Sequence, residues 1–340
     1  MKIQTLLFVT LLLNACGPQQ VDSRHGFHQG SSEIDQSNIL NNSNSDGSTS
    51  NTNDNGGTNN TNNDGGSGDA TPVTPETCPK FPVVFLHGLM GGSRGSFIGV
   101  IKHFQSLGCK VLLPEVSPVN SSEFRAAQVV EKIKTFLSDT KAAKVNIVAH
   151  SQGGLDARYA ISKLGIASSV ASLSMLSTPN YGSPIADLAL KDTKNSLSKL
   201  FLNLAFGSMA SVSNTSDGKS NDTTAALKAL SADYMKNTFN PNTPDVSGVM
   251  YQSWAARTGT GSKDRIKESL ILTERYLKKQ AGENDGMVPV SSAKWGEFRG
   301  VIDADHLDIG GTKMGDSGPD QFDHLKFLDG LLKELRTKGM

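Results

Sequence analysis

The sequence predicts an α/β fold in which a doubly wound, mainly parallel sheet carries a helical insert. Strand-like and helix-like patterns alternate along residues 82–176, and this order is typical of a sheet with helices on both faces. The strand-like stretches are continuous apolar runs, as expected for parallel strands that are buried on both sides. Residues 77–340 are also long enough for one well-buried domain of this class.

The first half of this domain contains the clearest elements. Short runs of β-branched and other apolar residues predict strands, and between them apolar residues recur every three or four positions, as in helices. Right-handed crossovers are expected to join the strands. The expected strands are 82–86, 111–113, 144–149 and 170–176, and the expected helices are 96–107, one that begins within 120–123 and reaches 137, and 155–164.

The second half of the domain interrupts this alternation. Residues 185–238 are rich in Ala, Leu, Ser and Lys, and their apolar residues are spaced as in amphipathic helices, so we expect a helical insert there. The later expected elements are a strand at 249–255, a helix at 264–280, a strand-like segment at 300–302 and a final helix at 321–337.

The N-terminal region is predicted to be a secretion signal followed by a tether. Residues 3–13 form an apolar stretch that is shorter than the about 20 residues of a membrane-spanning helix. The stretch leads into Cys16 in a pattern that resembles bacterial lipoproteins, so we expect residues 1–15 to be removed and Cys16 to be lipidated; an ordinary secretory signal is the alternative. Residues 16–76 have the composition of a disordered tether. This predicts a lipid-anchored protein of the bacterial cell envelope, at the outer membrane or the cell surface.

The charge balance bears on nucleic-acid binding, and the remaining cysteines bear on whether the domain contains a disulfide. Lys and Arg number 33 and Asp and Glu also number 33, so nothing in the composition indicates nucleic-acid binding. Apart from Cys16, the chain contains Cys78 and Cys109, each just before a strand-like run. Adjacent parallel strands would bring the two thiols together, so a disulfide and two buried free thiols remain as alternatives.

The strongest chemical motif lies between an expected strand and the helix after it. Ala149-His150-Ser151-Gln152-Gly153 matches the pattern G-x-S-x-G, with Ala149 in place of the first glycine. The pattern puts a serine on a strained turn, where small residues two positions before and after it let other backbone approach. We interpret Ser151 as a nucleophile, and a serine in an ordinary turn is the alternative.

Two backbone N–H groups are candidates for stabilising an oxyanion beside Ser151. The strand–turn–helix motif puts the N–H of Gln152 at a helix N-terminus, where it can stabilise an oxyanion. Leu89 lies in the loop HGLMGG at 87–92, whose glycines allow close backbone approach. His150 is expected to be hydrogen bonded and turned away from the reaction.

A serine nucleophile needs a base and an acid that orients the base, and in this fold the acid precedes the histidine. Asp285 lies in a polar turn and is the expected acid, with a solvated turn residue as the alternative. His306 and His324 share the triplet Asp-His-Leu. His306 is expected on a loop because it precedes a glycine-rich segment, whereas His324 falls on the apolar face of the last helix. We therefore expect His306 to be the base and His324 to be packed in the core.

The motifs around these residues, taken together with their neighbouring stretches, resemble the bacterial triacylglycerol lipases of the Pseudomonas type and their esterase relatives, in the α/β-hydrolase superfamily. The resemblance implies an α/β-hydrolase fold with a helical lid, acting as a lipase or carboxylesterase on lipid acyl esters through an acyl-enzyme. It implies Ser151, Asp285 and His306 as the triad, with Leu89 and Gln152 as oxyanion donors. The stretches that carry it, in the family's order, are PVVFLHGLMG (82–91), KVNIVAHSQGGLDARY (144–159), STPNYGSPIADL (177–188), ENDGMVPVSSAKWG (283–296) and ADHLDIGG (304–311).

The resemblance implies no cofactor for the chemistry, but it does imply a structural metal. Members of this family often bind Ca²⁺ near the catalytic histidine through an Asp two residues after it, which is Asp308 here. Asp264 is the nearest upstream candidate for a second carboxylate ligand, and Gly310-Gly311 stand where the family usually has Asn-Gln. Some relatives also require a dedicated folding chaperone as a partner.

Two alternative functions follow from the same residues. A phospholipase or an acyltransferase would use the same triad, so the motifs do not separate these activities from ester hydrolysis. A non-catalytic binding module on a hydrolase fold would lack a triad residue or the oxyanion loop, and the sequence contains all of them.

Overall fold

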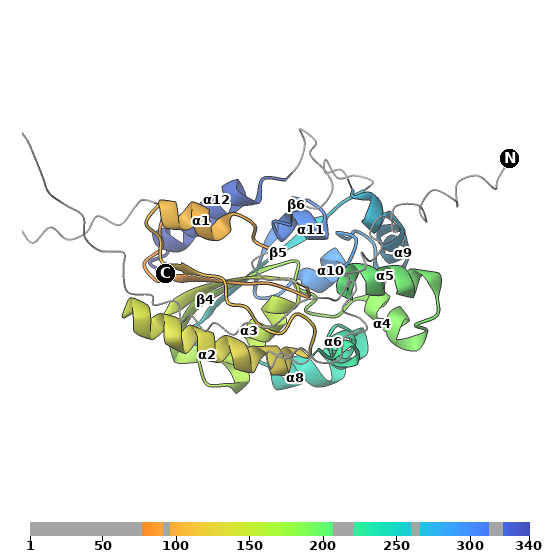
Figure 1. Cartoon of the computed structure of the whole chain (residues 1–340), viewed down its shortest axis with the longest axis horizontal. Helices are drawn as coiled ribbons and strands as arrows, with labels where there is room; N and C mark the ends of the chain where they lie inside the picture. The colour runs from red at the N-terminus through yellow and green to blue at the C-terminus, as the bar shows by residue number, and fades with distance from the viewer. Residues whose placement is uncertain (1–76, 91–95, 207–220, 260–265, 313–321) are drawn as a thin grey trace, which may run out of the picture. The chain divides into compact units, whose positions relative to one another are not determined.

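The computed structural model describes residues 77–90, 96–206, 221–259, 266–312 and 322–340. In this part of the chain, six strands form one sheet in the order β2-β1-β3-β4-β5-β6, and each neighbouring pair is parallel. Figure 1 shows the sheet between two layers of helices, which confirms the predicted fold class. The strands are β1 (Val83–Leu86), β2 (Val111–Leu112), β3 (Val145–His150), β4 (Val170–Leu176), β5 (Met250–Arg257) and β6 (Glu297–Asp303).

Helices cover both faces of the sheet because the strands are apolar on both sides. Alternate residues of β1 show this directly: Val84 belongs to the apolar cluster under α2 and α3, and Phe85 to the cluster under α1 and α12. All positions of β3 and β4 are buried, as expected for central parallel strands. The covering helices are α1 (Val100–Ser106), α2 (Ser122–Thr140), α3 (Gln152–Lys163) and α12 (His324–Thr337).

The strand order reverses between β1 and β3, because the chain moves outward from β1 to β2 and then returns to the other side of β1. In open α/β sheets, ligands bind beyond the carboxyl ends of the strands at such a switch point. The segments that leave β1 and β3 there are the loop after Leu86 and the turn at Ser151. The topology therefore predicts a ligand-binding site at these two segments.

The helical insert lies at one end of the molecule (right-hand side of Figure 1). Its apolar side chains, among them Ile185, Phe201 and Leu227, belong to a cluster that also contains Leu155 of α3. Part of the predicted lid, residues 207–220, lies outside the described residues. The described helical segments of the insert are α4 (Pro184–Lys191), α5 (Ser196–Phe206), α6 (Thr223–Ala229), α7 (Ala232–Tyr234), a π-helical turn (Met235–Phe239) and α8 (Asn240–Asn242).

Four helices begin at different residues from those the pattern predicted. The helices expected from residues 264 and 321 begin at Ile271 and His324. The helix expected from residue 96 begins at Val100, because Phe97 and Gly99 have positive φ angles of 53° and 79°. The helix expected from residue 155 already begins at Gln152, so the two glycines after it do not delay the helix. The remaining helical elements are a 3₁₀ turn (Ala167–Ser169), a second 3₁₀ turn (Glu268–Leu270), α9 (Ile271–Ala281), α10 (Val290–Ala293) and α11 (His306–Ile309).

Cys78 and Cys109 are joined in a disulfide. The two residues precede β1 and β2, which are neighbours in the sheet, so parallel pairing brings the thiols together. Among the described helices, none combines the length and the apolar character that crossing a membrane requires.

Candidate active site

Ser151 occupies the sharp turn between β3 and α3. Its φ of 55° lies in the left-handed region, which is strained for a residue with a side chain. The turn is possible because the neighbouring residues are small: a Cβ on Gly153 would lie 2.6 Å from the Leu86 carbonyl oxygen, and one on Gly88 would lie 2.6 Å from Ser151 Cβ. The close approach explains why the motif requires glycine at 153.

His306 connects Ser151 to Asp285. The distance from Ser151 Oγ to His306 Nε2 is 3.0 Å, and the distance from His306 Nδ1 to Asp285 Oδ2 is 2.8 Å. The tautomer that satisfies both bonds has its proton on Nδ1, which donates to Asp285. The three side chains come from the turn after β3, the loop before α10 and the start of α11, and all three residues are buried.

Backbone groups fix the orientation of the Asp285 carboxylate. Oδ1 of Asp285 accepts hydrogen bonds from the N–H groups of Met287 at 2.9 Å and Val288 at 2.7 Å, which leaves Oδ2 for His306. The His306 N–H donates to the Asp285 carbonyl oxygen at 2.9 Å. Asp285 and His306 are therefore held together through both backbone and side-chain hydrogen bonds.

The two predicted oxyanion donors come from the loop after β1 and from the start of α3. Gln152 is the first residue of α3, so its N–H points out of the helix start without an intrahelical acceptor. Leu89 lines the same pocket as Ser151 and His306. The Met90 N–H donates to the Pro118 carbonyl oxygen at 3.0 Å and thus anchors the loop just after Leu89.

Arg125, a fully buried residue of α2, forms hydrogen bonds with the loop that contains Leu89. Its Nη2 donates to the carbonyl oxygens of His87 at 2.7 Å and Gly88 at 3.3 Å. Its Nε donates to Asp156 Oδ2 at 2.7 Å, and Asp156 belongs to α3, the helix that begins beside Ser151. One guanidinium therefore ties the loop that contains Leu89 to the helix that begins beside Ser151.

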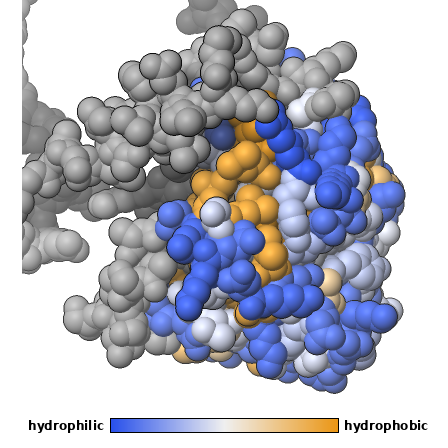
Figure 2. All heavy atoms as spheres, turned by 90° about the vertical axis from the view of Figure 1, so that its right-hand side faces the viewer, coloured by the Kyte–Doolittle hydropathy of each residue, from blue (hydrophilic) through white to orange (hydrophobic). Residues whose placement is uncertain are grey.

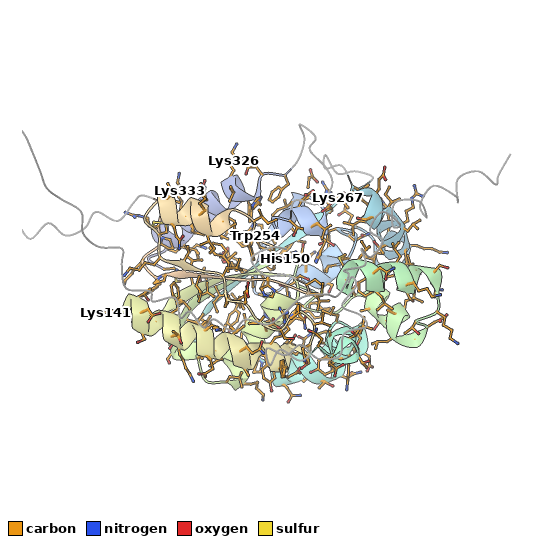
Figure 3. The ribbon with its side chains drawn as sticks, viewed as in Figure 1. Lys141, His150, Trp254, Lys267, Lys326 and Lys333 are labelled. Atoms are coloured by element: carbon orange, nitrogen blue, oxygen red, sulfur yellow. A yellow bond between two sulfur atoms is a disulfide. The ribbon has the colours of Figure 1, made fainter. Side chains whose placement is uncertain are left out.

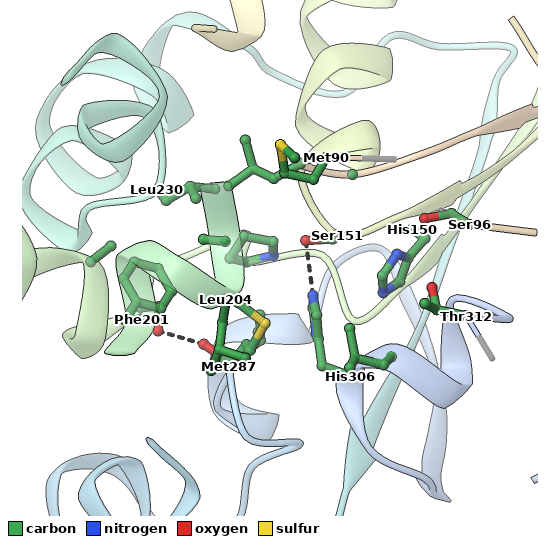
Figure 4. A pocket seen from close by; sticks show the side chains of 18 residues that line it. Met90, Ser96, His150, Ser151, Phe201, Leu204, Leu230, Met287, His306 and Thr312 are labelled. Carbon is green, nitrogen blue, oxygen red and sulfur yellow. Dashed lines mark hydrogen bonds between the residues drawn. The ribbon is translucent and has the colours of Figure 1, made fainter. Parts of the chain in front are cut away.

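The pocket beside Ser151 is mainly apolar. Figure 4 shows Phe201, Leu204 and Leu230 from the helical insert on one side of Ser151, with His150 on the other. Figure 2 shows the end of the molecule where the insert lies, and a continuous apolar strip crosses this surface between hydrophilic patches. An apolar pocket with a few polar groups at one point is typical of a small-molecule binding site.

His150 lies differently from the expectation. Its ring lines the pocket, with its centroid 4.6 Å from that of the His306 ring, and its two ring nitrogens have no hydrogen-bond partner among the described residues. Burial and the neighbouring His306 hold the pKa of His150 well below its ordinary value, so the ring is neutral at pH 7. The expectation of a hydrogen-bonded residue turned away was wrong; the absence of a side chain at Gly310 makes room for the ring.

His324 lies apart from the Ser151 site, as predicted. It is the first residue of α12, it is 7% exposed, and its Nε2 is 3.0 Å from the Ile98 carbonyl oxygen. Of the two histidines in Asp-His-Leu triplets, only His306 reaches Ser151.

The described oxygen donors near His306 do not fit a calcium site. Ca²⁺ takes six to eight oxygen ligands, whereas Asp308 contacts the ammonium group of Lys267 through Oδ1. No cluster of three or more potential metal ligands of the types His, Cys, Asp and Glu occurs in the part of the chain that the structure describes. Asp264, the other predicted ligand, lies outside the described residues.

Sequence reasoning missed two buried cations that hold the loops of the site, Arg125 and Lys267. Arg125 gave a signal, because it stands four residues before Val129 and eight before Ile133, on the apolar stripe of its helix. A charged residue in such a stripe is expected to be buried and therefore to have a partner, which indicates a structural or functional role. Lys267 gave no comparable signal, since its carboxylate partners lie far along the chain.

Comparisons with known proteins point to one group of enzymes. Residues 82–298 match the family described as alpha/beta hydrolase fold. The chain is 34% identical over 225 residues to triacylglycerol lipase 2 of Saccharomyces cerevisiae. This match covers 63% of this chain and 61% of the yeast protein, so the chain spans less than two thirds of that protein's length. It is 30% identical over 262 residues to the triacylglycerol lipase of Pseudomonas fragi, covering 67% of this chain and 87% of that protein. The crystal structure of the mature Bacillus licheniformis lipase BlEst2 shares the fold, with a TM-score of 0.54, 24% identity, and coverage of 69% of this chain and 86% of that one.

Proposed function

The chain belongs to the alpha/beta hydrolase fold family and is a carboxylic ester hydrolase, and from this premise we propose that it cleaves lipid acyl esters through the triad Ser151, His306 and Asp285. The observation that carries the proposal is the unbroken chain of hydrogen bonds from Ser151 through His306 to Asp285, buried beside an apolar pocket. A binding module on this fold would have no need for such a chain.

In the proposed mechanism, His306 Nε2 takes the proton of Ser151 as Ser151 Oγ attacks the ester carbonyl carbon. Asp285 holds the Nδ1–H and stabilises the imidazolium cation that forms. The N–H groups of Leu89 and Gln152 bind the oxyanion of the tetrahedral intermediate. His306 then returns the proton to the departing alcohol, which leaves an acyl group on Ser151. Water, deprotonated by His306, attacks this acyl-enzyme and releases the carboxylic acid.

The pocket supports an acyl chain as the group that the enzyme recognises. Its walls near Ser151 are formed by Phe201, Leu204 and Leu230, and these side chains offer apolar contact without hydrogen-bond donors. Because α5 and the segment that follows α6 supply these residues, the insert would shield the acyl chain from water. We infer that esters of medium or long acyl chains are the preferred substrates.

We also propose that the enzyme is held at the bacterial cell envelope by a lipid on Cys16. The support is the sequence of residues 1–16 and the tether composition of residues 16–76, all of which lie outside the described residues. Replacing Cys16 by Ser should release the protein from the membrane fraction in a cell fractionation experiment. Retention of the Cys16→Ser protein in the membrane would contradict the anchor.

The catalytic proposal is tested by turnover of p-nitrophenyl esters with increasing acyl length. Ser151→Ala and His306→Ala should remove turnover while the purified proteins keep the thermal unfolding of the parent. His324→Ala is the matched control: it should keep turnover at permissive temperature and lower the unfolding temperature, because its ring packs at the start of α12. Turnover that survives in Ser151→Ala would exclude the proposed nucleophile.

A further inference from the structure

Lys267 places an ammonium group between two carboxylates beside the His306 segment. Its Nζ is 3.1 Å from Asp305 Oδ2 and also contacts Asp308 Oδ1. All three side chains are almost completely buried, with exposed fractions of 5% for Lys267, 0% for Asp305 and 4% for Asp308. Figure 3 labels Lys267 in the region of the view where Figure 1 labels α11. A buried lysine is rare unless it is paired, so the two carboxylates account for its position.

The two carboxylates belong to the segment that carries the catalytic base. Asp305 precedes His306 and caps α11, since its Oδ1 accepts hydrogen bonds from the N–H groups of Leu307 and Asp308, both at 2.9 Å. Lys267 comes from the segment before α9, so the ion pairs connect that segment to both ends of the His306 turn. The ammonium therefore helps to set where His306 lies.

The same carboxylates would attract a divalent cation if the ammonium were absent. Each of them uses an oxygen to contact Lys267, and a Ca²⁺ ion at this point would meet a positive charge in a buried setting, where repulsion is poorly screened. Gly310 and Gly311, a few residues on, have no side-chain oxygen, and their carbonyl oxygens accept hydrogen bonds from the N–H groups of Phe97 and Ile98, so they do little to complete a coordination shell of six to eight ligands.

We propose that the Lys267 ammonium is a built-in cation that ties Asp305 and Asp308 together in the position of a calcium ion, so that the His306 turn is fixed without metal. Lys267 is a positioning residue, because it acts on His306 only through the two carboxylates. The inference rests on the proposed role of His306 for its effect on turnover, whereas its effect on stability does not depend on that role.

The first measurement is the thermal unfolding of the unmodified protein in excess EGTA and in millimolar Ca²⁺. The two midpoints should be the same. Ca²⁺ at a hundred times its dissociation constant would raise the midpoint by about 5 to 10 °C, so a rise of that size would overturn the proposal.

The second measurement uses Lys267→Met, with Lys132→Met as a control at an exposed position of α2. Lys267→Met leaves two buried carboxylates without their cation, so its unfolding midpoint should fall by about 10 °C, while that of Lys132→Met should not change. An unchanged midpoint in Lys267→Met would overturn the proposal.

The third measurement tests whether this position can hold another cation, or whether Lys267 only contributes to stability. In Lys267→Asp, three carboxylates would face one another, and Ca²⁺ should raise the unfolding midpoint by about 5 to 10 °C and increase the rate at which a fluorophosphonate labels Ser151. A Lys267→Asp protein that ignores Ca²⁺ would contradict the assignment of this position to a cation. If only the labelling rate failed to respond, the fault would lie with the proposed role of His306 and not with the cation.

Discussion

Replacing Asp285 by Asn should inactivate the enzyme without unfolding it, and the hydrogen bonds explain why. The N–H groups of Met287 and Val288 both donate to Oδ1, so the oxygen of an asparagine amide must occupy that position. The amide NH₂ then faces His306 Nδ1 in place of Oδ2. Since that NH₂ is a donor, Nδ1 must become the acceptor, and the imidazole proton moves to Nε2.

With its proton on Nε2, His306 donates toward Ser151 Oγ and can no longer accept the serine's proton. The same change in a serine protease lowers kcat by about 10⁴-fold while the geometry is kept. We expect a loss of this order here, which corresponds to about 5 kcal/mol in activation free energy. KM should change little, because Asp285 is fully buried and does not line the pocket.

The assay is kcat and KM for a p-nitrophenyl ester, together with thermal unfolding of the same samples. Asp329→Asn is the matched control, because Asp329 of α12 pairs with His103 of α1 at 2.9 Å and does not line the pocket beside Ser151. It should keep the parental kcat. A kcat for Asp285→Asn within about tenfold of the parent would refute the reasoning about the tautomer.

Three further predictions concern the loops, the disulfide and pH. Arg125→Lys keeps a charge beside Asp156 but cannot also bind both carbonyl oxygens of the His87 and Gly88 loop, so kcat should fall by about 100-fold with KM nearly unchanged; an unaltered kcat would exclude the clamp. Reducing the Cys78–Cys109 disulfide, which closes a loop with a sequence separation of 31, should lower the free energy of unfolding by about 3.7 kcal/mol in urea titrations, and equal values with and without reductant would argue against the bridge. Because the pKa of His150 is lowered in the folded state, unfolding takes up a proton below pH 6.5, so the parent should lose more stability than His150→Gln as the pH falls from 6.5 to 5; parallel pH curves for the two proteins would contradict the neutral buried ring.

The sequence was sufficient for the fold and for the residues that a motif marks. Continuous apolar runs predicted the strands of the parallel sheet, because a strand buried on both faces tolerates few polar residues. Ser151 was recognisable since the strained turn restricts its neighbours to small residues. His306 could be told from His324 because the glycines after it predict a turn, whereas helical spacing predicts burial of His324.

The features that were missed depend on contacts between residues far apart in the sequence. The pocket-facing position of His150 depends on the lack of a side chain at Gly310, which no local pattern around His150 reveals. The role of Lys267 depends on two carboxylates that lie 38 and 41 positions later in the chain. Helix starts were misjudged where tertiary contacts overrule local preference, as at Phe97, whose N–H donates to the Gly310 carbonyl oxygen at 2.8 Å.

The central claim, that Ser151 is a nucleophile activated by His306, is tested most directly by labelling with a fluorophosphonate probe and locating the adduct by peptide mass spectrometry. The account predicts one adduct on Ser151 in the parent, none in Ser151→Ala, and strongly slowed labelling in His306→Ala. Absence of an adduct from a folded parent protein, or an adduct on another serine, would contradict it.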